Sequence, residues 1–394
     1  MIDWSKAKPA GHWQLPFEGA WPTAVALLPS GKQLVAGNEK GELFVWDLPG
    51  DLVAEVGKNE TPPLAPVRQL VGHENGITRI VALPGGHTIA TASLDHTVRL
   101  WDLNAATAGT AEVVLDRESR ERKAKKGDKQ ANSAPGVTVA QQTDCVVLKS
   151  HADWVSALAL SRDGSQLVSG DYRAQVIVWD VASRAAKQQW QGLAWNWIVA
   201  LAFTPDAKSA LVSEVRYKRD DFDVPAAALR VWNVTDAQVT LDLLKAQFPK
   251  YDPQAASYEA SQVWRKFVAA GLVAVDVSPD GKLLAAGQGG ETDKGTIHLL
   301  DATSGKLVRS VGNHQYGVTD LRFTSDGRYL LSVGRDTTLR VTTVADGKEL
   351  LALNAPRGGQ FKDWLSALSV SADERRVAAA DIAGLVHVWQ LVDD

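Results

Sequence analysis

The stretch GHENGITRIVALPGGHTIATASLDHTVRLWD, residues 72–102, contains three short apolar segments separated by polar turns. The segments begin near Ile77, Thr88 and Thr97, and each is rich in β-branched residues, which favour strands. The turns between them contain Gly, Pro and Asp, which are typical of tight chain reversals. The stretch therefore predicts three β-strands joined by short turns.

The same pattern recurs along the chain, which makes an internal repeat the first feature to explain. A short apolar strand followed by a polar turn begins each unit, at residues 20–31, 75–86, 153–164, 196–207, 270–281, 316–327 and 363–374. A second and a third strand follow in every unit, and a more variable fourth strand precedes the next unit. A single four-stranded sheet cannot bury both of its faces, so we expect the sheets to pack face to face around an axis, as in a β-propeller.

The unit at 72–102 resembles a repeat of the WD-repeat family of β-propellers, and the resemblance covers nearly the whole chain. The resemblance implies a hydrogen-bonded set that links the loop between units to the strands, here His73, Ser93, Asp95 and Trp101. Such a set would satisfy buried polar groups of the loop and the turn.

Other units depart from this set. The third unit keeps His151 and Trp179, but it has Asp171 and Arg173 at the positions of Ser93 and Asp95. The sixth keeps His314 and Asp336, the fourth has Ala194 in place of the histidine, and the fifth has Val268. These differences leave the expected fold unchanged, but they predict other contacts under the loops of those units.

The last unit ends at Asp394 directly after its third strand, so its fourth strand must come from elsewhere. The segment HWQLPF (12–17) precedes the first unit and is available to supply it. We therefore expect an all-β fold: a seven-bladed β-propeller of four-stranded antiparallel blades, closed as a ring by the N-terminal strand. Residues 1–394 would form one domain.

Besides a segment at 50–66 between the third and fourth strands of the first unit, three insertions interrupt the repeat. Residues 105–143 include the basic run RESRERKAKKGDK (117–129), whose composition favours a flexible loop on the bottom face and leaves open a tail for an acidic partner. Residues 215–227 and 246–271 are expected on the top face, and 252–267 within the latter has a helical pattern. Packing over its own blades is one reading of that helix, and part of a binding surface is the other.

Tryptophan is frequent directly before the first strand of a unit. Trp21, Trp154, Trp197 and Trp364 occupy this position, whereas the other units have glycine there. In a propeller the position lies at the top rim of the central channel. Exposed tryptophans are typical of binding hot spots, although rings at this position can equally cover the adjoining blade. The sequence predicts a binding surface of these four with their neighbours Asp153, Trp195, Asn196 and Asp363.

Composition and motifs exclude several classes of function. The net charge of −4 gives no general attraction to nucleic acids, and no apolar run approaches the roughly 20 residues that span a bilayer. The single cysteine, Cys145, excludes an intrachain disulfide, which fits a cytoplasmic location, although export after removal of a signal peptide stays open. We find no metal-binding, cofactor-binding or catalytic motif.

The sequence therefore favours a non-enzymatic scaffold, monomeric by itself, that binds a protein or peptide through its top face. One alternative is a small-molecule-binding or ion-binding propeller, including a hydrolytic one. It would use the channel mouth near Asp171, Asp381 and the acidic residues 220–223. A purely structural module of a larger assembly is the third hypothesis.

Overall fold

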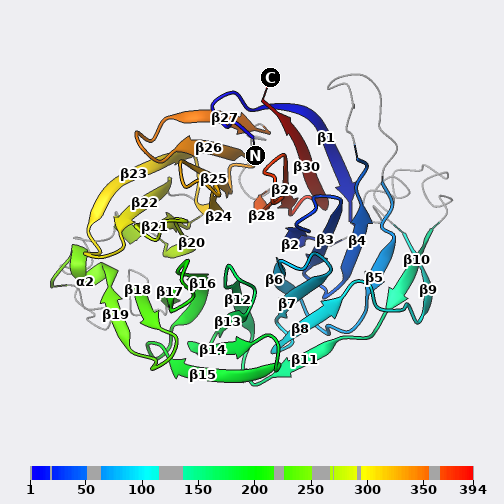
Figure 1. Ribbon diagram of the computed structural model, residues 1–394, viewed down its shortest axis with the longest axis horizontal. Coiled ribbons are helices and arrows are strands. Elements are labelled where there is room, and N and C mark those ends of the chain that lie inside the picture. Colours follow the sequence, from blue (N-terminus) through cyan, green and yellow to red (C-terminus); the bar gives the residue numbers. More distant parts are fainter. Residues whose placement is uncertain are drawn as a thin grey trace, which may run out of the picture. The chain divides into compact units, whose positions relative to one another are not determined.

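The computed structural model describes residues 2–17, 20–50, 64–114, 136–216, 226–250, 267–268, 270–290, 294–354 and 364–393. These residues form seven sheets, and each sheet contains one four-stranded blade (Figure 1). The expected fold class, an all-β seven-bladed propeller of antiparallel blades, is confirmed. The chain divides into two compact units, one of Met1–Ser93, Arg99–Val146 and Gly359–Asp394, the other of Leu94–Val98 and Val147–Gly358.

The first unit contains blades 1 and 7 and the inner strands of blade 2. Blade 1 consists of β2 (Pro22–Leu27), β3 (Gln33–Asn38), β4 (Leu43–Asp47) and β5 (Arg68–Leu70). Blade 2 consists of β6 (Ile77–Ala82), β7 (Thr88–Ser93), β8 (Thr97–Asp102) and β11 (Val146–Lys149), and the division between the units falls within its last two strands. Blade 7 consists of β28 (Leu365–Val370), β29 (Arg376–Asp381), β30 (Leu385–Val392) and β1 (Lys8–Pro16).

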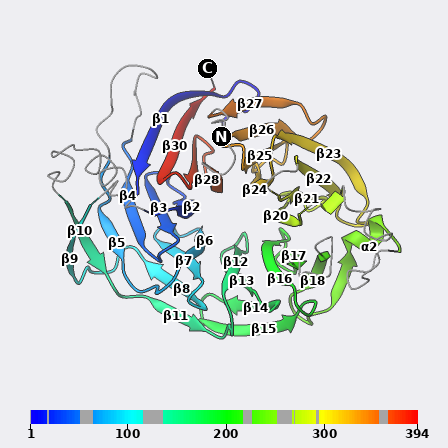
Figure 2. The same cartoon turned by 180° about the vertical axis from the view of Figure 1, so that it is seen from behind.

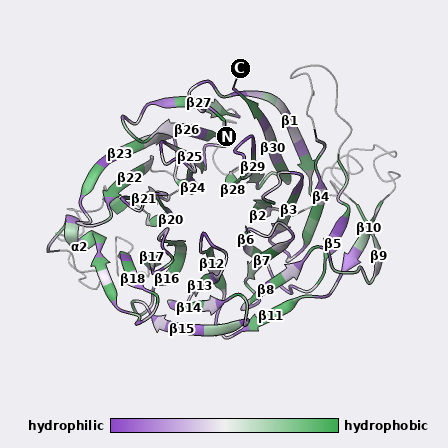
Figure 3. Cartoon of the chain, viewed as in Figure 1, coloured by the Kyte–Doolittle hydropathy of each residue, from purple (hydrophilic) through white to green (hydrophobic). Residues whose placement is uncertain are grey.

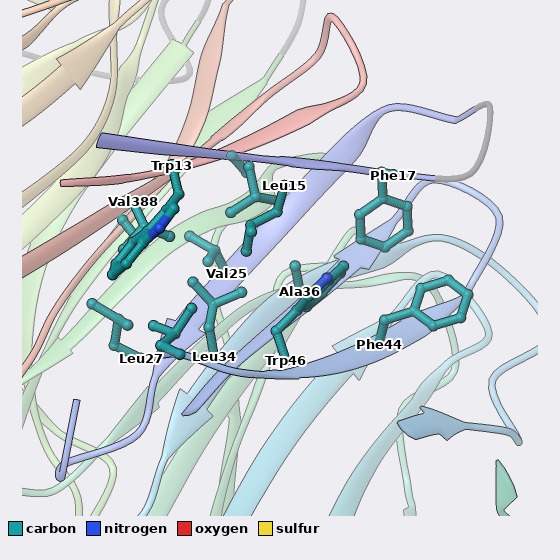
Figure 4. Close-up of a cluster of buried hydrophobic side chains, with 14 of the residues drawn as sticks. Trp13, Leu15, Phe17, Val25, Leu27, Leu34, Ala36, Phe44, Trp46 and Val388 are labelled. Carbon is teal, nitrogen blue, oxygen red and sulfur yellow. The ribbon is translucent and has the colours of Figure 1, made fainter. Parts of the chain in front are cut away.

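The N-terminal strand completes blade 7. Strand β1 pairs antiparallel with β30, from Lys8 opposite Val392 to Pro16 opposite Leu385. The predicted closing strand is thereby confirmed, and it begins four residues earlier than the segment 12–17. Trp13 and Leu15 of β1 are buried in one apolar cluster with Trp46 of blade 1 (Figure 4). This apolar burial stabilises the pairing, because each fully buried large side chain contributes about 2 kcal/mol.

The insertion at 105–143 contains a hairpin that extends the sheet of blade 1, so the expectation of a flexible loop is wrong for its two flanks. Strand β10 (Val137–Gln142) runs parallel to β5, and β9 (Gly109–Val113) pairs antiparallel with β10 (Figure 2). Val113 and Val139 are buried in the apolar cluster of blades 1 and 7. The basic run 117–129 lies outside the described residues.

The second unit contains blades 3 to 6. Blade 3 consists of β12 (Val155–Leu160), β13 (Gln166–Asp171), β14 (Gln175–Asp180) and β15 (Ala185–Gln191). Blade 4 consists of β16 (Trp197–Phe203), β17 (Ser209–Arg216), β18 (Ala226–Asn233) and β19 (Val239–Asp242). Blade 5 consists of β20 (Leu272–Val277), β21 (Leu283–Gln288), β22 (Gly295–Asp301) and β23 (Leu307–His314). Blade 6 consists of β24 (Val318–Phe323), β25 (Tyr329–Gly334), β26 (Leu339–Thr343) and β27 (Glu349–Leu353).

The other two insertions fall mostly outside the described residues. Strand β17 ends at Arg216 and β18 begins at Ala226, so only the ends of the insertion 215–227 are described. A short helix not foreseen from the sequence, α2 (Leu243–Gln247), follows blade 4, and Asp242 caps it. Phe267 and Val268 are helical and buried, whereas the rest of the expected helix 252–267 is not described. The placement of all three insertions on particular faces stays a prediction.

Blades 3 and 4 pack through small residues and apolar strands. A Cβ on Gly170 would lie 2.4 Å from the side chain of Ile198, so only glycine lets β13 approach β16 this closely. The hydroxyl of Ser156 donates to the carbonyl of Ile198, which adds a polar link at the same seam. Apolar residues dominate these inner strands, and polar residues appear along the exposed outer strand β15 (Figure 3).

Candidate docking surface on blades 3 and 4

The loop that enters blade 2 is held by a histidine and a shared hydroxyl. His73 Nε2 lies 2.7 Å from Thr91 Oγ1, and Trp101 Nε1 donates to the same oxygen at 2.9 Å. The hydroxyl between the two rings is therefore that of Thr91, not of Ser93 as we expected from the sequence. The Ser93 hydroxyl instead donates to the carbonyl of Asn75, and Asp95 accepts from Thr97.

Blade 3 has the same arrangement with one change. His151 Nε2 lies 2.6 Å from Ser169 Oγ, which also accepts from Trp179 Nε1 at 2.8 Å. Asp171 lies at the register position of Ser93, and its carboxylate is 3.0 Å from His151 Nδ1. Four buried side chains thus tie the loop to the two strands β13 and β14, and hydrogen bonding removes the cost of burying them.

Blade 6 uses the same histidine with an aspartate from the turn. His314 lies between Ser332, at 2.8 Å, and Asp336, at 2.9 Å. Burial raises the pKa of Asp336, but hydrogen bonds from His314, Thr338 and the Gln315 amide outweigh burial and hold it well below the usual range. This carboxylate is therefore committed to the loop contact.

Blade 4 lacks the histidine and replaces it with a buried ion pair. Glu214 lies at the register position of Asp171, and its side chain is fully buried. One carboxylate oxygen accepts from the backbone N–H of Leu193 at 2.6 Å, and the other accepts from the guanidinium of Arg230 on β18. The anchor of the loop thus comes from the strands rather than from the loop itself.

Blades 5 and 7 place a third-strand histidine beside the same register position. In blade 5, His298 and Gln288 both bond to the carbonyl of Phe267 at 2.7 Å. In blade 7, Asp381 bonds to His387 at 2.9 Å, and His387 lies 3.0 Å from His12 of β1. In these blades the third-strand histidine is therefore the partner of a buried polar residue of the second strand.

Aromatic side chains gather where the loops of blades 3 and 4 meet. Tyr172 stacks on Trp197 with ring centroids 4.2 Å apart and planes within 1°. Trp154 lies beside Tyr172 in a tilted arrangement, with ring centroids 5.5 Å apart. Trp154 is 43% exposed and Trp195 is 74% exposed, the largest exposure among the large apolar residues described. Sequence reasoning had not included Tyr172, whose place follows from the turn after β13.

The polar neighbours of these rings have different surroundings. Asp153 forms an exposed ion pair with Arg173 at 3.2 Å, and it also caps the amide of Trp154. Asn196 is buried, and its side-chain nitrogen, Nδ2, has no hydrogen-bond partner among the described residues.

The remaining members of the expected surface belong to the other compact unit or are not described. Trp21 is 54% exposed and Trp364 is half-buried, and both belong to the first unit. Asp363 lies outside the described residues. The structure therefore brings Trp154 and Trp197 together with Tyr172, and Trp195 lies in the loop directly before Trp197.

The acidic groups proposed for a small-molecule or ion site are engaged internally. Asp171 bonds to His151, and Asp381 bonds to His387, both with fully buried side chains. Residues 220–223 lie outside the described part of the chain. Within the described residues no group of three or more metal-binding side chains gathers, and no helix is both long and apolar enough to cross a membrane.

Comparison with known proteins supports a repeat architecture. The family model "WD domain, G-beta repeat" matches residues 64–102, 142–180 and 305–342. These matches contain the third strands of blades 2, 3 and 6, which are the blades anchored by His73, His151 and His314. The unmatched blades are those in which another residue replaces this histidine.

Several curated proteins are similar over part of their length. Autophagy-related protein 16 of Arabidopsis thaliana is 25% identical over 62% of this chain and 49% of its own. Nuclear distribution protein nudF of Aspergillus niger is 26% identical over 84% of this chain and 60% of its own. Target of rapamycin complex subunit LST8 of Saccharomyces cerevisiae is 29% identical over 24% of this chain and 28% of its own. The chain thus spans from about a quarter to three fifths of these relatives.

The repeat match and the seven blades agree with each other. Blades 2, 3 and 6 carry both the matched repeats and the histidine anchors, and the other four blades have the same strand order. The chain therefore carries WD repeats in blades 2, 3 and 6 of a seven-bladed β-propeller.

Proposed function

We propose that this protein is a non-enzymatic scaffold that binds a protein or peptide through the aromatic surface of blades 3 and 4. This surface, here named the aromatic surface, consists of Trp154, Tyr172, Trp195 and Trp197. The observations that carry the proposal are the exposure of Trp154 beside a stacked Tyr172–Trp197 pair and the exposure of Trp195, two residues before Trp197 in the chain. Contiguous exposed aromatic surface is costly in water and is typical of binding hot spots.

Two further observations favour a binding role over an enzymatic one. The buried acidic groups of blades 3 and 7 bond to histidines of their own blade, which leaves them unsuited to act on a substrate. Among the relatives, LST8 is by its name a subunit of a complex, so a protein similar to part of this chain assembles with other proteins. Trp21 and Trp364 stay candidates for a second contact.

The test is binding of a partner captured from the source lysate and then purified. We expect the double variant Trp154→Ala/Trp195→Ala to raise the dissociation constant at least about 30-fold, because truncation of a hot-spot residue costs about 2 kcal/mol or more of binding free energy. Val308→Ala is the matched control, since Val308 is 53% exposed on outer strand β23 of the same unit. The control should bind as the wild type does.

A photo-crosslinking amino acid locates the contact independently of affinity. Placed at position 195, it should form an adduct with the partner, and placed at position 308 it should not. Equal affinity of the double variant and the wild type, with no adduct at 195, would assign binding to another surface.

A further inference from the structure

Among the described residues, three backbone amides of the loop that carries Trp195 donate hydrogen bonds. Gly192 N–H donates to the carbonyl of Ala174 at 2.7 Å, and Asn196 N–H donates to the carbonyl of Leu193 at 3.1 Å. The third bond, from Leu193 N–H to Glu214 at 2.6 Å, is the one that uses a charged side chain. Hydrogen bonds to an ionised acceptor are roughly twice as strong as neutral ones.

Trp195 has a backbone conformation that a bulky residue rarely adopts. Its φ is +70°, in the left-handed region, where a Cβ crowds the following carbonyl. Ala152, at the same position of blade 3, is not among the residues with positive φ. Such a conformation persists only where the surrounding contacts over-determine it, so the loop needs an anchor that resists relaxation.

The ion pair under the loop is built to supply that anchor. Glu214 is fully buried, and the guanidinium of Arg230 balances its charge while also lying 4.8 Å from the ring centre of Trp232. A Cβ on residue 192 would lie 2.5 Å from a carboxylate oxygen of Glu214, so glycine is what lets the loop come this close. Each of the two carboxylate oxygens then serves a different donor, one on the loop and one on β18.

We propose that Glu214 and Arg230 are positioning residues for docking: they hold loop 192–196 in the strained conformation that presents Trp195. The part of this inference that concerns docking rests on the proposed function, whereas the part that concerns the loop does not. Neither residue is itself expected to contact the partner, because both are buried or nearly so.

The test measures amide hydrogen exchange in Glu214→Gln and Gly192→Ala. In Glu214→Gln one oxygen becomes an amide nitrogen, so the side chain can accept from the Leu193 amide or from Arg230, but not from both. In Gly192→Ala the carboxylate must move while its charge is kept. We expect the amides of 193–196 to exchange about tenfold faster in both variants, while those of β17 and β18 keep wild-type rates.

Glu349→Gln is the matched control, because Glu349 is also paired with a third-strand arginine, Arg340, in the same unit. It should leave exchange at 193–196 unchanged. Wild-type exchange at 193–196 in both test variants would overturn the proposal, as would faster exchange along all of blade 4, which would indicate a general stabilising role.

Binding of the purified partner separates the two proposals. If the loop loosens and affinity falls in Glu214→Gln as in Trp195→Ala, positioning for docking is supported. If the loop loosens and Trp195→Ala weakens binding but Glu214→Gln does not, the link between anchor and docking is overturned. If neither variant changes affinity, the proposed docking surface fails, and the docking role of the pair fails with it.

Discussion

Blades 3 and 4 share strand register and a tryptophan at the start of the first strand, but they differ in what holds the loop above them. In blade 3 the loop provides the anchor, because His151 inserts between Ser169 and Asp171. In blade 4 the strand provides it, because Glu214 reaches up to the amide of Leu193. The same buried position thus carries an acid in both blades. In blade 3 it bonds to a loop side chain, whereas in blade 4 it bonds to the loop backbone.

This difference changes what the loop sequence is free to do. An anchor made by a side chain fixes one loop residue as histidine, whereas an anchor made to the backbone leaves loop side chains unconstrained. Blade 4 has Ala194 at the histidine position and exposes Trp195 next to it. Replacing the histidine therefore coincides with the most exposed aromatic ring on the described surface.

The largest expected effect is loss of the blade 3 anchor. His151→Ala leaves Asp171 and Ser169 buried without their central partner, so we expect the free energy of unfolding to fall by about 3 kcal/mol. Ala194→Ser, at the same position of blade 4, should change it by less than about 0.5 kcal/mol. Urea unfolding at pH 7.5 measures both. Equal losses in the two variants would contradict the claim that blade 4 no longer uses this position.

A smaller effect should arise beneath the loops, at the third-strand tryptophans. Trp179 donates to Ser169, whereas Trp232 has no hydrogen-bond partner among the described residues, because Val212 occupies the register position of Ser169. Val212→Thr would add an acceptor there. The new hydroxyl and the indole of Trp232 would each gain a hydrogen-bond partner. We therefore expect the free energy of unfolding to fall by no more than about 0.5 kcal/mol.

Val168→Thr is the control for this substitution. Val168 is equally buried, in blade 3, but its register position differs from that of Ser169, so the new hydroxyl would lack the indole partner. We expect a loss of about 2 kcal/mol from burying it. Thermal unfolding of the two variants side by side gives the difference, and equal losses would show that Val212 does not face the indole as its register implies.

Much of the fold could be predicted from the sequence, because strand periodicity and turn residues are local signals that repeat. The seven units, the third-strand tryptophans and the closing strand near His12 all follow from alignment of the chain with itself. The hairpin β9–β10 could not, since its pairing with β5 joins residues about 70 positions apart and its tip is polar.

The contacts of the candidate site were harder to predict from the sequence. Alignment placed Ser93 in the blade 2 network, but Thr91 lies between the two rings. Residues two positions apart on a strand face the same side, so strand alternation did not distinguish the two hydroxyls. Glu214 and Arg230 occupy aligned columns, so their pairing was detectable as opposite charges on neighbouring strands. The left-handed conformation of Trp195 was not, since bulky residues give no signal for it.

The last expected effect concerns the pH dependence of unfolding and the histidine anchor of blade 5. Burial lowers the pKa of His298 from its ordinary value of 6.5 to about 4, although its bond to the Phe267 carbonyl opposes the shift. The unfolded chain therefore binds the proton more readily than the folded one between these values. The stability that neutral His298 contributes is fully present above pH 6.5 and is lost as the pH falls toward 4.

Between pH 8 and pH 6 this group should lower the free energy of unfolding by about 1 kcal/mol, measured as a shift of the urea midpoint. His12 has a similarly lowered pKa of about 4, from burial and the nearby His387, so the wild type responds to both groups. His298→Gln keeps an amide donor toward Phe267 but cannot titrate, so it should remove only its own share of the pH dependence.

Blade 4 has no titrating histidine in its anchor, so Glu214→Gln should leave the dependence between pH 8 and pH 6 intact. If His298→Gln instead kept the full wild-type pH dependence, titration of His298 would not contribute to stability. The histidine and ion-pair anchors would then differ in their geometry but not in their response to pH.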